Sequence, residues 1–235
     1  MPVRRIVVLN PKGGSGKTTI ATNLAAYFAS KGLPTALLDH DAQGSSVRWL
    51  SKRDDEAAPI HGIAMFEEPV GVTKTFAHHI PHDIERVIVD TPASFKKHEL
   101  LNYVRGADKV VVPVLPSDID IHAAARTIGD LLLNAGNLRR EQRLGVVANR
   151  VKRNTIVFRS LMKFLESLDI PVVGVLRDTQ NYIRAAQSGA GLHEMSGPTL
   201  HKDLAQWNRL LRWLDTEPAP RVSAPLSQAR DVREG

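Results

Sequence analysis

Residues 11–19 combine glycines, two lysines and two threonines in an order that suits a phosphate chain. The segment reads Pro11-Lys12-Gly13-Gly14-Ser15-Gly16-Lys17-Thr18-Thr19. Its glycines let backbone N–H groups curl around phosphate oxygens, and a helix that begins there adds its positive dipole end. In a G-x-x-x-x-G-K-[ST] loop, the lysine reaches the β and γ phosphates and the next hydroxyl ligates Mg²⁺. Lys17 and Thr18 are therefore expected to bind ATP and its metal.

The loop departs from that pattern at its start, because Pro11 stands where the pattern has glycine and Lys12 follows it. The competing interpretation is a glycine-rich turn that binds nothing. A strand before the loop, a helix after it and the intact Gly-Lys-Thr triplet argue against such a turn. The residues predicted to contact the nucleotide are Gly13, Gly14, Ser15, Gly16, Lys17, Thr18 and Thr19.

Short β-branched runs alternate with helical segments along the chain, and the runs are apolar without alternation. Strands of that kind are buried on both faces, which indicates a parallel sheet covered by helices. Strands are predicted at Val3–Leu9, Thr35–Asp39, Arg86–Asp90, Lys109–Val114, Leu144–Ala148 and Val172–Leu176, with an edge strand at Ile60–Phe66. Helices are predicted at Lys17–Ser30, Ser45–Arg53, Lys96–Val104, Ile119–Leu133, Thr155–Leu168, Tyr182–Ser188 and about Leu200–Leu214.

Right-handed crossovers between such elements give an α/β fold of the P-loop NTPase kind, with a doubly wound, mostly parallel sheet and helices on both faces. Ligands of these sheets bind at the carboxyl ends of the strands. One site is therefore expected to lie among the loops that follow Leu9, Asp39, Asp90, Val114 and Ala148.

The length of 235 residues suits a single α/β domain, predicted to span residues 1–215. Residues 216–235 contain three prolines and almost no large apolar side chains, which predicts a disordered tail. Cysteine is absent, which excludes disulfides, thiolate metal sites and iron–sulfur clusters. Because the sequence has neither an apolar run of about 18 residues nor a secretory h-region, we expect a cytoplasmic protein with no membrane partner.

The formal net charge of +6 is concentrated in one part of the chain. Between Arg139 and Arg184 there are ten basic and four acidic residues, so this stretch alone carries the whole excess of six. Such clustering is typical of a polyanion-binding face, and equally of a solvated helix surface.

The run K-G-G-x-G-K-T-T, with Lys12 at its start, resembles the signature of the deviant Walker A ATPases, the ParA/MinD superfamily. The resemblance covers roughly residues 3 to 215. It implies a homodimer that sandwiches ATP, in which Lys12 of one subunit reaches the phosphates bound by the other. An added positive charge at that place would stabilise the negative charge that develops during phosphoryl transfer.

Three further segments resemble this superfamily. Leu37–Gly44 is similar to its D-x-D-P-Q-G segment, which implies that Asp41 orients the attacking water and Asp39 lies near the metal. Val87-Ile88-Val89-Asp90 resembles the Walker B strand, whose aspartate holds Mg²⁺ directly or through water. Asn149 follows a later strand at the place where relatives contact adenine. A single Asn in a loop is as often a turn residue.

Two departures from the family pattern affect the mobile loops. Ala42 replaces the usual proline of the D-x-D-P-Q-G segment, which predicts a more mobile loop. Ala93-Ser94-Phe95 replaces the usual P-P-x-x-G after the Walker B aspartate, so the movement of this segment on hydrolysis is not given by the resemblance.

Within the superfamily, the basic stretch favours a ParA-type positioning ATPase. Such a protein forms ATP-dependent dimers that bind nucleoid DNA without sequence preference, until a cargo adaptor or ParB-like protein stimulates hydrolysis. Lysine and arginine supply most non-specific affinity for DNA by neutralising phosphates. The candidate DNA-binding residues follow two neighbouring strands and are Arg150, Lys152, Arg153, Arg177 and Arg184.

Two kinds of cargo are compatible with the sequence. Residues 115–122 (LPSDIDIH) and 176–182 (LRDTQNY) are similar to the carboxysome-positioning members, the McdA type. Plasmid or chromosome segregation is equally compatible with the chemistry.

Two other functions compete with positioning. A MinD-like division regulator needs a C-terminal amphipathic helix with basic and bulky apolar faces, and the last twenty residues offer none. A metabolic ATP-dependent synthetase of the same fold needs a pocket for a small substrate, and no such constellation is evident from the sequence.

Overall fold

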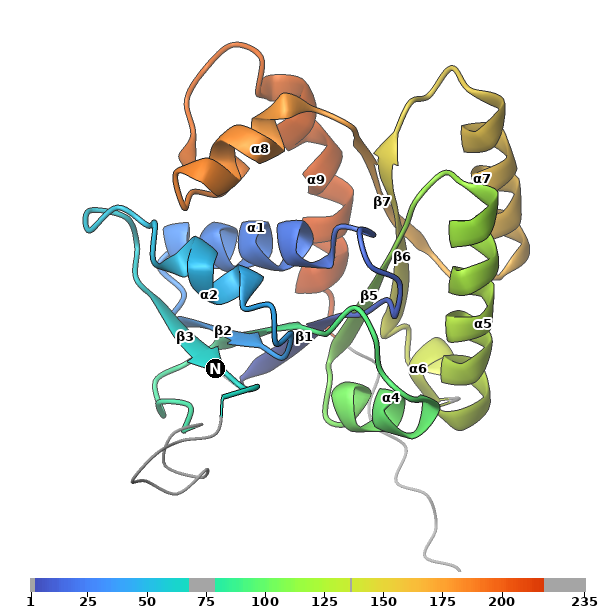
Figure 1. Ribbon diagram of the computed structural model, residues 1–235, viewed down its shortest axis with the longest axis horizontal. Coiled ribbons are helices and arrows are strands. Elements are labelled where there is room, and N and C mark those ends of the chain that lie inside the picture. Colours follow the sequence, from blue (N-terminus) through green and yellow to red (C-terminus); the bar gives the residue numbers. More distant parts are fainter. Residues whose placement is uncertain (1–2, 68–78, 136, 218–235) are drawn as a thin grey trace, which may run out of the picture.

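The computed structural model describes residues 3–67, 79–135 and 137–217, and seven strands of this part form one parallel sheet (Figure 1). The strands are β1 Arg4–Val8, β2 Thr35–Asp39, β3 Ile60–Ala64, β4 Arg86–Asp90, β5 Lys109–Val114, β6 Leu144–Val151 and β7 Val172–Arg177. Their order across the sheet is β3-β2-β4-β1-β5-β6-β7. The predicted doubly wound α/β fold of the P-loop NTPase kind is confirmed.

Helices cover both faces of the sheet (Figure 1). They are α1 Lys17–Ser30, α2 Ser45–Leu50, α4 Lys97–Val104, α5 Asp118–Asn134, α6 Asn137–Arg140, α7 Ile156–Ser167, α8 Gln180–Gln187, the 3₁₀ turn η1 Leu192–Glu194 and α9 His201–Asp215. The core residues of α4, α5 and α7 belong to one hydrophobic cluster. Those of α1, α2, α8 and α9 belong to a second cluster, on the other face.

The strands are apolar throughout because both of their faces are covered. In β1, Val7 packs into the cluster under α5 and α7, while Ile6 and Val8 pack into the cluster under α1 and α9. All five residues of β4 are buried in the same way. This two-sided burial is the physical cause of the non-alternating pattern seen in the sequence.

Strand register places three chain segments at one point of the sheet edge. Asp39, at the end of β2, is paired with Asp90, at the end of β4. Asp90 is paired in turn with Val8, at the end of β1, immediately before the phosphate loop. The two carboxylates and the loop therefore lie side by side, as the topological rule predicts.

Most element boundaries agree with the prediction within a few residues, and two elements end at other residues than expected. The second helix was expected to reach Arg53 but ends at Leu50. Strand β6 was expected to end at Ala148 but continues to Val151, with a register shift against β7 and a positive φ of 51° at Arg150. Asn149 consequently lies within β6, not in the loop after it. The short α6 and η1 have no periodic pattern and were not predicted.

Residues 218–235, which make up almost all of the predicted tail, lie outside the described residues. No helix in the described ranges is long and apolar enough to cross a membrane.

A buried carboxylate ties the last helix to the end of β7. Asp203 of α9 is fully buried and forms an ion pair with Arg177 of β7. It also accepts a hydrogen bond of 2.6 Å from Nδ2 of Asn181, in the first turn of α8. Burial alone would raise the pKa of Asp203, but hydrogen bonds from Arg177 and Asn181 hold that pKa below its usual value. Arg177 is thus part of the structural framework.

Replacement of Asp203 by alanine is expected to lower the free energy of unfolding by about 3 kcal/mol, because the Asn181 amide and the Arg177 guanidinium lose their common partner. Urea denaturation followed by circular dichroism measures this difference. The matched control is Asp169→Ala, which breaks the exposed ion pair with Arg139 and should cost less than about 1 kcal/mol. Equal losses in the two variants would contradict the structural role of Asp203.

Candidate functional site: a phosphate loop over two buried carboxylates

The phosphate loop connects β1 to α1 and depends on glycine at Gly16. This residue precedes the first turn of α1 with a φ of 89°, a conformation that side chains rarely adopt. A Cβ atom added there would also lie 2.2 Å from Nδ2 of Asn149. That amide instead donates a hydrogen bond of 2.9 Å to the carbonyl oxygen of Ser15. β6 therefore holds the loop in place through Asn149. Asn149 also lines the cavity described next, so its predicted contact with the nucleotide stays a prediction.

The loop faces a cavity of about 880 Å³, a volume in the range typical of ligand sites. The residues predicted to bind nucleotide that line it are Gly13, Gly14, Gly16, Lys17, Thr18, Thr19 and Asn149. Ser15 is buried behind the loop and does not line the cavity. Lys17 is also largely buried, and its Nζ lies 3.3 Å from the carbonyl oxygen of Lys12. Burial lowers the pKa of Lys17, although Asp90 and Asp41 oppose the shift.

Two carboxylates are completely buried beneath the cavity, at the ends of β2 and β4. Asp39 accepts three backbone N–H groups, from Asp41 at 3.0 Å, from Ser46 at 2.9 Å and from Val47 at 3.2 Å. Both of its oxygens are taken by these contacts. Asp39 thereby anchors the start of α2 and the loop that carries Asp41. Its predicted place near the metal stays a prediction, and Asp39 is paired with Asp90 at the neighbouring strand end.

Ser46 joins the two carboxylates. Its backbone N–H binds Asp39, and its hydroxyl donates a hydrogen bond of 2.6 Å to Oδ2 of Asp90. Ser46 is itself fully buried, so these bonds are made without competition from water. This residue was not singled out from the sequence, because a serine in the first turn of a helix is common. Only the pairing of β2 with β4 shows that it faces Asp90.

Asp90 has the properties expected of a metal-binding carboxylate. Within the described part of the chain its Oδ1 atom is buried and has no hydrogen-bond partner. Burial raises the pKa of Asp90 to about 6, although the hydroxyls of Ser46 and Thr18 and the charge of Lys17 lower it. A buried carboxylate oxygen beside a threonine hydroxyl is a fitting ligand set for Mg²⁺, which takes one or two carboxylates together with phosphate oxygens. The residues present therefore fit the ion.

Asp41 lies at the cavity wall and connects two loops. Its Oδ1 accepts the N–H of Gln43 at 3.0 Å, and its Oδ2 accepts the N–H of Ala93 at 3.2 Å. Ala93 belongs to the segment after Asp90 that lacks the family's usual glycine and second proline. The position of this segment is therefore tied to Asp41 by a direct hydrogen bond.

Lys12 is part of the loop but does not line the cavity. Its Nζ lies 3.1 Å from Oδ1 of Asp120, which is in the first turn of α5 and only 7% exposed. Ser117, the residue before α5, binds the other carboxylate oxygen of Asp120. The lysine side chain is thus directed away from the phosphate loop of its own subunit and toward the N-terminus of α5.

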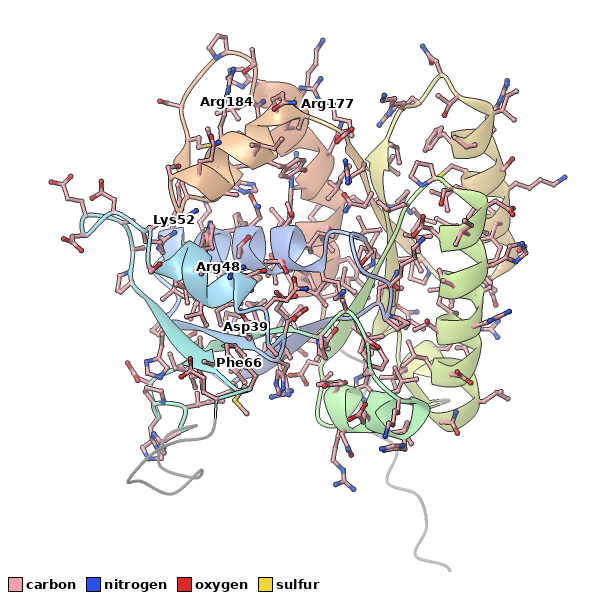
Figure 2. The ribbon with its side chains drawn as sticks, in the orientation of Figure 1. Asp39, Arg48, Lys52, Phe66, Arg177 and Arg184 are labelled. Atoms are coloured by element: carbon pink, nitrogen blue, oxygen red, sulfur yellow. The ribbon has the colours of Figure 1, made fainter. Side chains whose placement is uncertain are left out.

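The remaining cavity wall comes from α2, α8 and the loops beside them, and from Ala93 in the loop after β4. The sequence did not assign α2 and α8 to the site. This part of the wall includes Gln43, Ser45, Lys52, Ala93, Asp178, Thr179, Gln180, Tyr182, Ile183, Ala186 and Gln187. α8 follows the carboxyl end of β7, so the topological rule could have placed its first residues here. A smaller space of about 220 Å³ between α1, α2 and α8 adds Arg48. Figure 2 shows Arg48 and Lys52 on the α2 side and Arg184 on the α8 side.

The five residues predicted to bind DNA have different surroundings. Arg150 lines the cavity and its Nε lies 3.4 Å from Oδ1 of Asp178. Arg177 is bound to buried Asp203. Lys152, Arg153 and Arg184 are exposed. Arg150, Lys152 and Arg153 lie at the carboxyl end of β6 and Arg177 at that of the neighbouring strand β7, while Arg184 lies in α8.

Residues 6–192 match the family model described as the CobQ/CobB/MinD/ParA nucleotide binding domain. Among curated proteins, the maintenance of carboxysome distribution protein A of Halothiobacillus neapolitanus is 29% identical over 194 residues, which cover 81% of this chain and 87% of that protein.

Two solved structures illustrate the range of proteins with this fold. A plasmid partition protein from Borrelia burgdorferi bound to AMPPNP has a TM-score of 0.67 at 14% identity, covering 89% of this chain and 99% of that one. The MinD cell division protein of Aquifex aeolicus has a TM-score of 0.63 at 20% identity, covering 93% and 100%. At these identities the likeness concerns the fold.

Replacement of Ser46 by alanine is expected to weaken Mg²⁺-dependent nucleotide binding, because Asp90 loses the hydroxyl that fixes its orientation. The loss of such an outer partner typically costs roughly tenfold or more in metal affinity. Titration of a fluorescent ATP analogue at a series of Mg²⁺ concentrations measures it, and binding without Mg²⁺ should stay unchanged. Ser51→Ala is the control, because Ser51 is an exposed serine just after α2 that does not line the cavity. An unaltered Mg²⁺ dependence in Ser46→Ala would reject this role.

Proposed function

The chain belongs to the CobQ/CobB/MinD/ParA nucleotide-binding family, and on that premise we propose that it is a ParA-type positioning ATPase. In this proposal the protein binds ATP, forms a homodimer around it and binds double-stranded DNA without sequence preference. A cargo adaptor or ParB-like protein stimulates hydrolysis and so releases the dimer. This cycle would place the protein in the cytoplasm, on the nucleoid.

The position of Lys12 carries the proposal. The cavity already contains one lysine for the phosphates, Lys17, and Lys12 lies outside it in contact with Asp120. A partly exposed lysine in the phosphate loop can serve the phosphates of a second copy when it leaves Asp120. This supports a site that two subunits complete together.

The chemistry assigned to the remaining residues follows from their surroundings. Gly13, Gly14, Gly16 and Thr19 would hold the phosphates through the loop, and Lys17 would reach the terminal ones. Thr18 and Asp90 would hold Mg²⁺, which when bound neutralises charge on the β and γ phosphates. Asp41 would orient the attacking water, because it lies at the cavity wall and its position is fixed by Ala93.

The relatives favour a large intracellular body as the cargo. The match to a carboxysome distribution protein covers most of both chains, and supports a carboxysome or a comparable assembly. The likeness to a plasmid partition protein keeps DNA cargo compatible with the same chemistry. Of the other functions considered, a division regulator or a synthetase, neither is favoured by a feature of the described residues.

The proposal is tested by binding to random-sequence duplex DNA, measured by fluorescence anisotropy with ATP or ADP, alongside phosphate release. Wild-type protein should bind with ATP and not with ADP. Asp41→Ala should keep ATP-dependent DNA binding while turnover falls by roughly a hundredfold, since general-base and positioning groups contribute about that much. Lys17→Ala is the control that should lose nucleotide binding. Wild-type protein that fails to bind DNA with ATP at moderate salt would refute the positioning function.

The contact between Lys12 and Asp120 is expected to weaken dimerisation, because Lys12 must leave Asp120 before it can serve a second copy. Asp120→Asn keeps an oxygen for the Ser117 contact but removes the charge that holds Lys12. With a non-hydrolysable ATP analogue, we expect the dimer of this variant to form at about fivefold lower protein concentration, which corresponds to about 1 kcal/mol. Analytical ultracentrifugation measures the shift, and Asp118→Asn, an exposed neighbour, is the control. A weaker dimer in Asp120→Asn would show that Asp120 supports the dimer instead of restraining Lys12.

A further inference from the structure

The fold sorts the basic stretch from Arg139 to Arg184 into paired and unpaired cations. Four arginines are paired with carboxylates: Arg139 with Asp169, Arg143 with Glu141, Arg150 with Asp178 and Arg177 with Asp203. Three of these acids are among the four of the stretch itself. The charge excess seen in the sequence therefore does not form one uniform face.

Of the other basic residues, Arg184 is exposed on α8, and four exposed cations lie together on the outer side of one element. Lys152 and Arg153 are in the loop before α7, and Arg159 and Lys163 are on α7. Across residues 3–67, 79–135 and 137–217, none of the four forms an ion pair. We infer that these side chains, here called the α7 ridge, form the main contact surface for the phosphate backbone of double-stranded DNA. The inference rests on the proposed function and names the surface that performs its DNA step.

The loop and the helix of the α7 ridge are held in a fixed relation by Thr155. Its hydroxyl donates a hydrogen bond of 2.7 Å to the carbonyl oxygen of Lys152 and accepts the N–H of Phe158 at 3.3 Å. On the inner side, Leu161 and Leu165 anchor α7 in the core. The cations of the loop and those of the helix are therefore presented as one surface.

The spacing along the α7 ridge suits a phosphate backbone. Arg159 and Lys163 are four residues apart, so they lie on the same face of α7 and about 6 Å apart along its axis. Phosphates of one DNA strand recur at about 3.4 Å along the duplex axis and lie farther apart through space, so two cations at this spacing can each contact a phosphate of the same strand. The positive end of the α7 dipole is directed toward Lys152 and Arg153 and adds to their attraction for anions.

A protein partner is the competing occupant, because Ile156 and Val157 are exposed beside these cations at 73% and 47%. The charge balance favours DNA. The α7 ridge has four unpaired cations, and α7 itself contains one acidic residue, Glu166. A protein partner would therefore need a matching acidic surface. The geometry also changes the set of DNA-binding residues that was expected from the sequence. It adds Arg159 and Lys163, and it gives Arg150 and Arg177 partners in the fold.

The decisive variant is Arg159→Glu combined with Lys163→Glu, assayed for ATP-dependent binding to random-sequence duplex DNA at several salt concentrations. Each phosphate contact contributes about 0.9 to the slope of log affinity against log salt. The loss of two contacts per protomer should lower that slope by about 2 per protomer and the affinity by roughly tenfold or more at moderate salt. Nucleotide binding and thermal stability should stay at wild-type values.

The matched control is Arg209→Glu combined with Arg212→Glu, two exposed arginines of α9 on the other face of the sheet. It changes the net charge equally, so a purely global effect would appear in both variants. Wild-type affinity and slope in the α7 variant, or equal losses in the two variants, would overturn the inference. Loss of dimerisation in the α7 variant, with nucleotide binding by its monomers retained, would also overturn the inference. Absence of DNA binding in the wild-type protein would instead refute the proposed function.

Discussion

The site depends on two aspartates that are fully buried side by side, Asp39 and Asp90. Water cannot stabilise their charges, so the surrounding chain must supply hydrogen bonds or positive charge. Asp39 is satisfied by three backbone N–H groups at the start of α2. Among the described residues, Oδ2 of Asp90 accepts a hydrogen bond from Ser46 and Oδ1 has no partner within hydrogen-bonding distance. Asp39 is therefore fully hydrogen-bonded, whereas Asp90 keeps one buried oxygen that a cation could contact.

This arrangement couples parts of the chain that are far apart in sequence. The backbone contacts of Asp39 fix the loop that carries Asp41, and Asp41 in turn holds the segment after Asp90 through Ala93. Asn149 connects β6 to the phosphate loop from the other side. Because these contacts converge on one cavity, a ligand that displaces any of them would move the neighbouring loops. Two firmly buried carboxylates beneath loops that can move form the kind of arrangement that a nucleotide-dependent switch requires.

The charged residues outside the cavity also fall into two groups: some stabilise the fold, and others are accessible to a ligand. Arg177 binds the buried carboxylate of Asp203 and so joins β7 to α9, and Arg143 and Glu141 form a buried pair at the opposite end of the sheet. Lys12 is held by Asp120 in a contact that leaves a third of the lysine side chain exposed, so this bond can be exchanged for another. The cations on and beside α7 have no partner among the described residues and are available to an anion.

Local patterns in the sequence are enough to predict the fold class, most element boundaries and the phosphate loop. Apolar runs, helix starts and the glycines of residues 13–16 act over a few neighbouring residues. Three-dimensional packing is needed to show which charges are paired, that Asn149 lies within β6, and that Ser46 faces Asp90. Such contacts join residues on different strands and helices, such as Lys12 with Asp120 and Arg177 with Asp203. Their energies depend on burial and distance, which no local pattern encodes.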